Sequence, residues 1–429
     1  MLPNPISPSM DKHATLTALL VCFCYLPLHS QFIISGEYRP RAEYRHGFQS
    51  LAAEDQEEAF FIDQRTRLNV NYKTEKYAIR LVLQDVRTWG SQRQLVADDG
   101  ALTTLHEAWG QVFLDDKFSI KLGRQEIAYD DHRIFGNVGW AQQARSHDAA
   151  LLRFNDGGTQ FDVGLAYNQD GPRSISTFYS VANSYKAFQY VWFRKTFDEF
   201  SGSLLFLNNG LQGGDASDFD TYFSQTIGGR FSWANSPFTA NLNAYYQTGK
   251  LPDGTTEINA SLIGLDLGYK LTESSTATLG VELISGNNQV DPDSKSQAFN
   301  PFYGTNHKFN GLMDYFFVGN HINNVGLRDF YVQVKSGKRF KIIPQLHFFL
   351  TEGDLMDPSD SQAADSFLGT ELDVVFNYKV SDQINLQGGY SQMFASESME
   401  ILKGGDQDAT SNWAWVMLTL KPVFYSNEN

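Results

Sequence analysis

The chain has 429 residues, with 49 acidic against 34 basic side chains and a formal net charge of −15. Such an excess of negative charge argues against a nucleic-acid partner, because the phosphate backbone would repel it. The chain has 2 cysteines, Cys22 and Cys24, both close to the N-terminus, so disulfide bonds or cysteine-bound metals are excluded as the means of holding the rest together.

Residues 1–30 are expected to form a cleavable signal peptide. Lys12 precedes an apolar stretch over residues 14–28, and a plausible cleavage site follows at position 30. A lipid anchor on Cys22 is the weaker alternative, because the residues before it are not small. Residues 31–429 would then be an exported, cysteine-free chain forming a single domain.

The first segment of that domain carries a charge at every second residue. The charged residues are Glu37, Arg39, Arg41, Glu43 and Arg45. Side chains of a strand alternate between two faces, so one face here is all charge. A row of five ionised groups is rare on a soluble sheet but ordinary where a membrane barrel faces its water-filled lumen.

The same alternation returns along the whole chain. It is clearest over residues 62–73, 117–122, 160–167, 238–247, 265–270, 371–378 and 384–391. Turn residues separate these segments, and counting every candidate predicts about 18 strands. The fold class expected is therefore all-β, a transmembrane antiparallel barrel with short periplasmic turns and long extracellular loops, the longest near 286–313 and 352–365.

The longest charge-free run, Phe231 to Gly249, is not expected to be a membrane helix. It contains Pro237 and several asparagines, and Arg230 and Lys250 flank it. These features predict two short strands joined by a turn.

The most polar region extends from Leu122 to Asp148 and allows three interpretations. Asp130 or Asp131 with His132 could act as acid and base or as metal ligands, but no nucleophile or ligand spacing supports this. A second interpretation is a charged network that holds an inward-folded loop. The third, which we favour, is a pore constriction whose arginines select solutes.

Three blocks of sequence resemble the alginate-export family of outer-membrane barrels, and its Bacteroidetes branch in particular. They are Leu122–Ile127 with Tyr129–Arg133 and Trp140–Ala149, then Phe299–Gly311 with Met313–Tyr315, and finally Asn412–Leu418. The resemblance covers essentially all of residues 31–429. It implies a monomeric channel in the outer membrane with an arginine-lined lumen. We expect this channel to pass an anionic saccharide or polysaccharide, or a similar hydrophilic solute, by passive diffusion and without a cofactor.

Candidate residues for such a lumen follow from facing and from the resemblance. Arg39, Arg41, Arg45, Arg65 and Arg67 fall on polar faces, and Arg80, Arg124, Arg133, Arg145, Arg153 and Lys308 are further candidates for the solute path. Carboxylates that could pair with them are Glu37, Glu43, Asp63, Glu107, Glu126, Asp130 and Asp131. A guanidinium group keeps its charge and pairs carboxylates in a fork, so a row of arginines offers exchangeable sites to a polyanion.

Two features of the sequence limit what the resemblance implies. The C-terminus continues past Phe424 to Asn429, whereas barrel chains commonly end on an aromatic residue, and the acidic total does not favour a polyanion.

Two alternative functions remain. A porin for small solutes is the first, favoured if arginine–carboxylate pairs cross the lumen. A secreted carbohydrate-binding protein or hydrolase is the second, but no carboxylate pair across a cleft identifies it.

Overall fold

A computed structural model describes residues 30–95 and 103–427 of the chain, so the expected signal peptide lies outside the described residues except for Ser30. The described residues form one sheet of 19 strand segments. No helix among them is long and apolar enough to cross a membrane.

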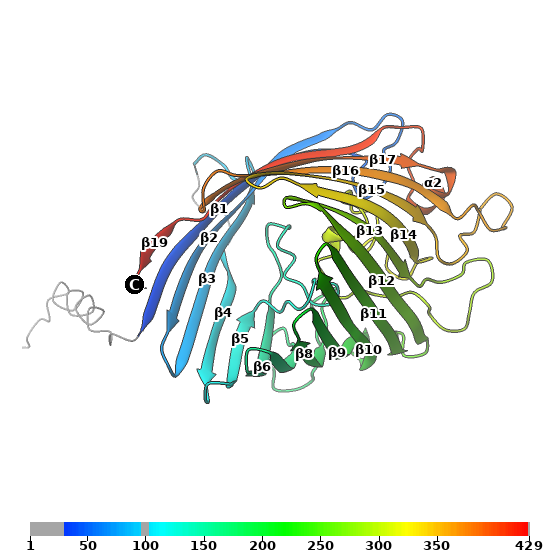
Figure 1. Cartoon of the computed structure of the whole chain (residues 1–429). Coiled ribbons are helices and arrows are strands. Elements are labelled where there is room, and N and C mark those ends of the chain that lie inside the picture. Colours follow the sequence, from blue (N-terminus) through cyan, green and yellow to red (C-terminus); the bar gives the residue numbers. More distant parts are fainter. Residues whose placement is uncertain (1–29, 96–102, 428–429) are drawn as a thin grey trace, which may run out of the picture.

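The strands follow one another around the sheet in chain order (Figure 1). They are β1 (Gln31–His46), β2 (Ala59–Lys73), β3 (Tyr77–Thr88), β4 (Thr103–Phe113), β5 (Phe118–Gln125), β6 (His147–Asn155), β7 (Thr159–Tyr167), β8 (Ala187–Thr196), β9 (Phe200–Asp215), β10 (Asp218–Asn235), β11 (Phe238–Lys250), β12 (Glu257–Thr272), β13 (Ser275–Ile284), β14 (Leu327–Ser336), β15 (Phe340–Leu350), β16 (Phe367–Lys379), β17 (Ile384–Ala395), β18 (Ser411–Leu420) and β19 (Val423–Ser426). Two short helices, η1 (Asn306–Lys308) and α2 (Glu397–Lys403), lie in the connections.

The sheet closes into a barrel because β1 pairs antiparallel with β2 on one side and with β18 and β19 on the other. Pro422 interrupts the last strand, since proline cannot donate to a ladder, and β19 resumes the pairing with β1. Counting β18 and β19 as one strand gives a closed antiparallel barrel of 18 strands, which confirms the predicted fold class.

The two faces of the barrel wall differ as the alternation predicts. On β3, the side chains of Ile79, Leu81 and Leu83 point outward and are more than 40 % exposed, whereas Val82 and Gln84 point inward and are buried. A row of exposed leucines would be costly in water and is stable against lipid. The outer face is therefore apolar, and the polar face surrounds the interior.

The connections differ at the two rims. Turns such as 74–76, 236–237 and 273–274 are short, while 126–146 and 285–326 are long. Both β1 and β19 have their free ends at the short-turn rim (Figure 1). The charge-free run is divided as predicted, because β10 ends at Asn235 and β11 begins at Phe238.

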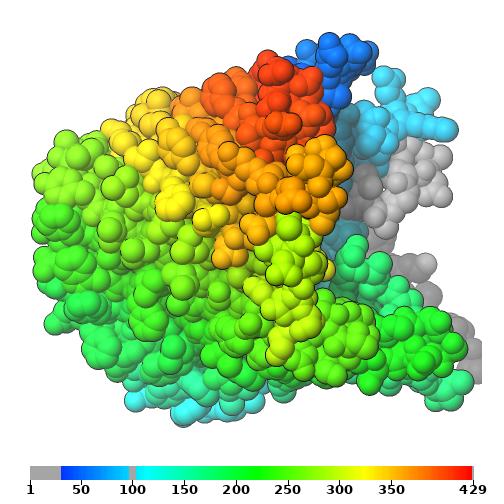
Figure 2. Space-filling model, turned by 90° about the vertical axis from the view of Figure 1, so that its right-hand side faces the viewer, coloured from blue at the N-terminus to red at the C-terminus, as the bar shows by residue number. Residues whose placement is uncertain are grey.

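Segments 126–146 and 285–326 fold into the barrel and pack on each other; we call them the plug. The Phe135 and Tyr303 backbones form a parallel bridge, and Gly136 N donates to Tyr303 O at 2.8 Å. The rings of Phe135 and Tyr303 stack with centroids 5.5 Å apart. Figure 2 views the molecule from the long-loop side, where segments of the middle and C-terminal parts, green to orange, pack together.

Candidate functional site

One wall of the barrel interior carries a cluster of arginines, Arg39 and Arg41 on β1 and Arg65 on β2. The register places Arg39 opposite Arg65, so the two side chains leave the wall side by side. All three are buried, with at most 6 % of their surface exposed. What covers them is the plug.

Segment 139–142 of the plug lies directly against these three side chains. Arg39 donates to Gly139 O at 2.7 Å and to Trp140 O at 3.1 Å, and Arg41 donates to Trp140 O at 2.8 Å. The Arg65 guanidinium reaches Gln142 O at 3.3 Å. Charged donors make strong hydrogen bonds to carbonyl groups, so the three arginines hold the segment in place. We call them the arginine clamp.

Carboxylates neutralise part of the clamp. Arg41 lies 2.7 Å from Glu43 and 3.1 Å from Asp63, and Arg65 donates from Nε to Glu37 at 2.7 Å. Buried charges need such partners to offset the loss of water. A charged network that holds an inward-folded loop, the second interpretation of the polar region Leu122–Asp148, describes these contacts directly.

The other two arginines of the polar faces are also paired. Arg45 contacts Glu43 at 2.8 Å and lies 4.1 Å from the centre of the Phe48 ring. Arg67 donates to Gln84 at 2.7 Å and lies 3.9 Å from Glu126. These side chains bind the wall together and present little unpaired charge.

The remaining plug candidates tie the plug to the opposite wall. Arg133 is fully buried and contacts Glu282 of β13 at 2.8 Å, and Asp131 contacts Arg230 of β10 at 2.5 Å. Lys308 donates to the Asp131 carbonyl at 2.6 Å, which joins the two segments of the plug.

Asp130 and Arg145 make further ties. The Trp192 indole donates to Asp130 at 3.0 Å, and Arg145 donates to Gly304 O at 3.2 Å. Burial lowers the pKa of Arg145 and of Lys308, and raises the pKa of Asp130. The plug is thus charged but largely withdrawn from water.

Arg80 and Arg153 face the interior from the barrel wall and each pairs with a carboxylate. Arg80 contacts Glu107 at 2.6 Å, and Arg153 contacts Asp162 at 2.7 Å. Both are about one-third exposed, so they belong to the wall of the lumen but are not free cations.

Arg124 does not belong to the lumen, which corrects the sequence-based expectation. It shares the outward row of β5 with Ile120 and Leu122 and pairs with Asp148 of β6 at 2.9 Å on the outer surface. The same alternation that places Leu122 outside places Arg124 there too.

A cavity of about 380 Å³ opens beside the clamp toward the short-turn rim; we call it the inner cavity. Its charged lining residues are Arg39, Arg65, Lys338, Lys341, Lys379 and Lys421 against Glu37 and Asp382. Six cations face two carboxylates, so the cavity attracts anions. The sequence reasoning missed these four lysines, which lie at strand ends or in turns where alternation gives no facing.

A second cavity, of about 580 Å³, is lined by residues 140–143 of the plug; we call it the outer cavity. Arg41, Arg45 and Arg145 line it together with the rings of Trp140 and Phe302. Arg39 and Arg65 line the inner cavity, and the plug residues 140–142 that they contact line the outer cavity. Guanidinium groups can pair with carboxylates in a fork.

A third cavity, of about 290 Å³, lies along the opposite wall and has the opposite charge. Asp131, Asp266, Glu282 and Asp329 line it, against Arg230 and Lys308. The interior is therefore cationic along β1 and β2 and acidic along β10 to β14.

Among residues 30–95 and 103–427, no group of three or more histidine, cysteine, aspartate or glutamate side chains could hold a metal ion. Asp131, one of the two aspartates considered with His132 as acid and base or as metal ligands, pairs instead with Arg230.

Comparisons with known proteins agree with a membrane channel. The model of the alginate export family matches residues 30–415. Similar solved structures include OccAB4 of Acinetobacter baumannii (14 % identity, TM-score 0.62, 92 % of this chain and 98 % of that chain covered). They also include OccK11 (OpdR) of Pseudomonas aeruginosa (10 % identity, TM-score 0.58, 92 % and 96 % covered). A search of curated protein sequences gives no match.

Proposed function

We propose that the solutes of this protein are anionic saccharides. The premise is that the chain belongs to the alginate export family and forms an outer-membrane barrel for hydrophilic solutes. Transport would be passive, through the cationic side of the lumen, with the short-turn rim in the periplasm. Exported by a cleavable signal peptide over residues 1–30, the protein would act as a monomeric channel and not as an enzyme.

The observation that carries the proposal is the charge of the inner cavity. Four of its six cations are lysines, and Lys341 makes no ion pair with any carboxylate of the described residues. The carboxylate partners of Lys338 and Lys379 are themselves highly exposed, so these pairs exchange readily with a solute. Conduction needs sites that attract an anion without trapping it, and exposed lysines meet both conditions.

The clamp supports a role for this cavity in selection. It fixes segment 139–142 next to cations of both cavities, Arg39 and Arg65 in the inner one and Arg41, Arg45 and Arg145 in the outer one, so a solute passing along this wall would meet cations in both. Arg39 contributes to both functions, because it holds the segment and lines the inner cavity.

Oligosaccharide block in planar bilayers tests the proposal. Oligouronates added to the purified channel should interrupt the single-channel current, and neutral oligosaccharides of equal length should interrupt it far less. Equal block by both, or no block by either, would contradict an anionic saccharide as the solute.

A porin for small solutes is the second candidate, and the acidic third cavity together with the paired arginines favours it. Carboxylates on one wall and cations on the other suit small dipolar solutes better than a long polyanion. Rapid permeation of small zwitterions, with no block by oligouronates, would favour this candidate.

A further inference from the structure

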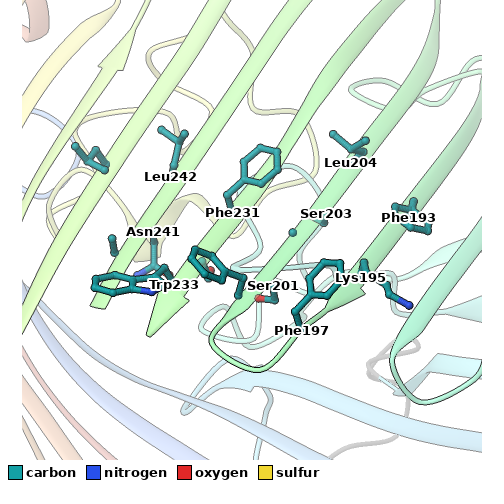
Figure 3. A pocket seen from close by; sticks show the side chains of 15 residues that line it. Phe193, Lys195, Phe197, Ser201, Ser203, Leu204, Phe231, Trp233, Asn241 and Leu242 are labelled. Carbon is teal, nitrogen blue, oxygen red and sulfur yellow. The ribbon is translucent and has the colours of Figure 1, made fainter. Parts of the chain in front are cut away.

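A groove of about 580 Å³ lies on the outer face of the barrel, near the short-turn rim (Figure 3). Strands β8 to β12 and the turn at 197–199 form it. Its rim consists of aromatic and leucine side chains, of which Phe197, Phe200 and Leu204 are each more than 55 % exposed. It lies outside the lumen, so no part of the proposed transport uses it.

Small residues on the outward rows make the groove. Gly202 of β9 has Phe200 and Leu204 as its outward neighbours, and a Cβ there would lie 3.1 Å from the Phe231 ring. The absent side chain lets that ring lie over the sheet. Ala240 of β11 is the other small residue on an outward row of the lining, so bulky side chains surround a hollow.

A positive charge stands at the short-turn end of the groove. Lys195 shares the outward row of β8 with Phe193, and both line the groove (Figure 3). Its ammonium group donates to the Thr159 hydroxyl at 2.7 Å and lies 5.9 Å from the centre of the Phe197 ring. No carboxylate of the described residues lies within ion-pair distance of it; Asp156 is an acidic neighbour, and Asp198 and Glu199 follow in the adjoining turn.

From this combination we infer that the groove binds one glycerophospholipid, with an acyl chain along the apolar lining and the phosphate on Lys195. Lysine and tryptophan side chains are placed this way at the edge of a bilayer, and Trp233 lies in the same lining. A headgroup that joins phosphate to an ammonium group complements Lys195 and the acids of the turn together. The occupant is therefore phosphatidylethanolamine in the leaflet that meets the short-turn rim.

Native mass spectrometry of the full-length barrel in detergent, titrated with phosphatidylethanolamine, tests this inference. Ala240→Phe should fill the groove, and Lys195→Gln should remove the phosphate contact, each lowering lipid retention about tenfold. Ala244→Phe is the matched control, because Ala244 lies on the same outward row of β11 but outside the groove. It should retain lipid as the unchanged protein does.

Diacylglycerol with the same acyl chains separates headgroup recognition from general contact with lipid. Retention of diacylglycerol as strong as that of phosphatidylethanolamine would overturn the inference. So would equal losses in Ala240→Phe and Ala244→Phe, which would indicate lipid bound over the whole outer face. The mobility shift of each variant on heating in SDS gels verifies that its barrel is folded.

Discussion

Arg39 is the residue of the clamp with the most hydrogen bonds to segment 139–142 of the plug. Its guanidinium donates to three successive carbonyl groups, those of residues 139–141, and to the Gln142 side chain. Arg39→Gln removes these bonds and should loosen segment 139–142 by about 2 kcal/mol, because buried carbonyl groups lose their charged donor. Single-channel recordings should then show a larger and noisier conductance.

Arg124→Gln is the control for that experiment, since Arg124 is a paired arginine on the outer face. Its conductance should equal that of the unchanged channel. If Arg39→Gln also leaves conductance and noise unchanged, the clamp does not position the segment.

At this scale the sequence predicts which way side chains face, but not what they touch. Alternation gives the inward facing of Arg39 and Arg41, and, extended two residues beyond Leu122, it gives the outward facing of Arg124. The partners of Arg39 are out of reach because they lie about 100 residues away in the chain. Lys341 escapes notice because it lies at the start of β15, where alternation gives no clear facing.

At the scale of an element, the docking of the plug segment next to α2 should depend on pH. His321 is buried between the rings of Phe316 and Phe317, and burial lowers its pKa from 6.5 to about 3. Lys403 of α2 donates to Asn320 O at 3.0 Å, and burial lowers its pKa from 10.5 to about 7. Both groups bind protons more weakly when docked than when free.

Docking of residues 311–326 should therefore weaken as the pH falls. Lys403 accounts for the change between about pH 10.5 and 7, and His321 for the change between about pH 6.5 and 3. Hydrogen exchange of this segment, corrected for intrinsic rates, should show less protection at pH 4.5 than at pH 7.5.

His321→Gln supplies the control, because glutamine does not titrate. The variant should lose most of the difference between the two pH values. Equal protection of the unchanged protein at both pH values would contradict the role of His321.

The strands could be predicted from the sequence because apolar and polar side chains alternate along them with a period of two. The plug has no such period and could not be predicted in this way. Long connections near 286–313 and 352–365 are visible in the sequence, but their paths are fixed by distant contacts. Arg133 and Glu282, for example, meet across 149 residues. No local sequence pattern predicts such a pair.

For the whole molecule, closure between β1 and β18 can be tested by a disulfide. The register places Ala42 opposite Val416, and paired residues of neighbouring strands lie within disulfide reach. Ala42→Cys with Val416→Cys should cross-link and prevent the mobility shift on heating. Ala42→Cys with Ala414→Cys, which is out of register, should not; equal cross-linking by both pairs would contradict the described seam.

Phe424 lies at this seam, although it is not the last residue of the chain, as the aromatic end of a barrel commonly is. A Cβ on Gly36 would lie 2.8 Å from the Phe424 ring, so the aromatic residue packs over the first strand. The last strand thus keeps an aromatic residue at the closing edge although the chain continues to Asn429.

The charge of the inner cavity is the central claim, and the reversal potential across a salt gradient tests it most directly. The unchanged channel should select anions over cations, despite the net charge of −15 on the whole chain. The triple variant Lys341→Gln, Lys379→Gln and Lys421→Gln should lose most of this selectivity, because it removes three of the six cations lining the cavity. An unchanged reversal potential in the triple variant, or a cation-selective parent channel, would contradict the account.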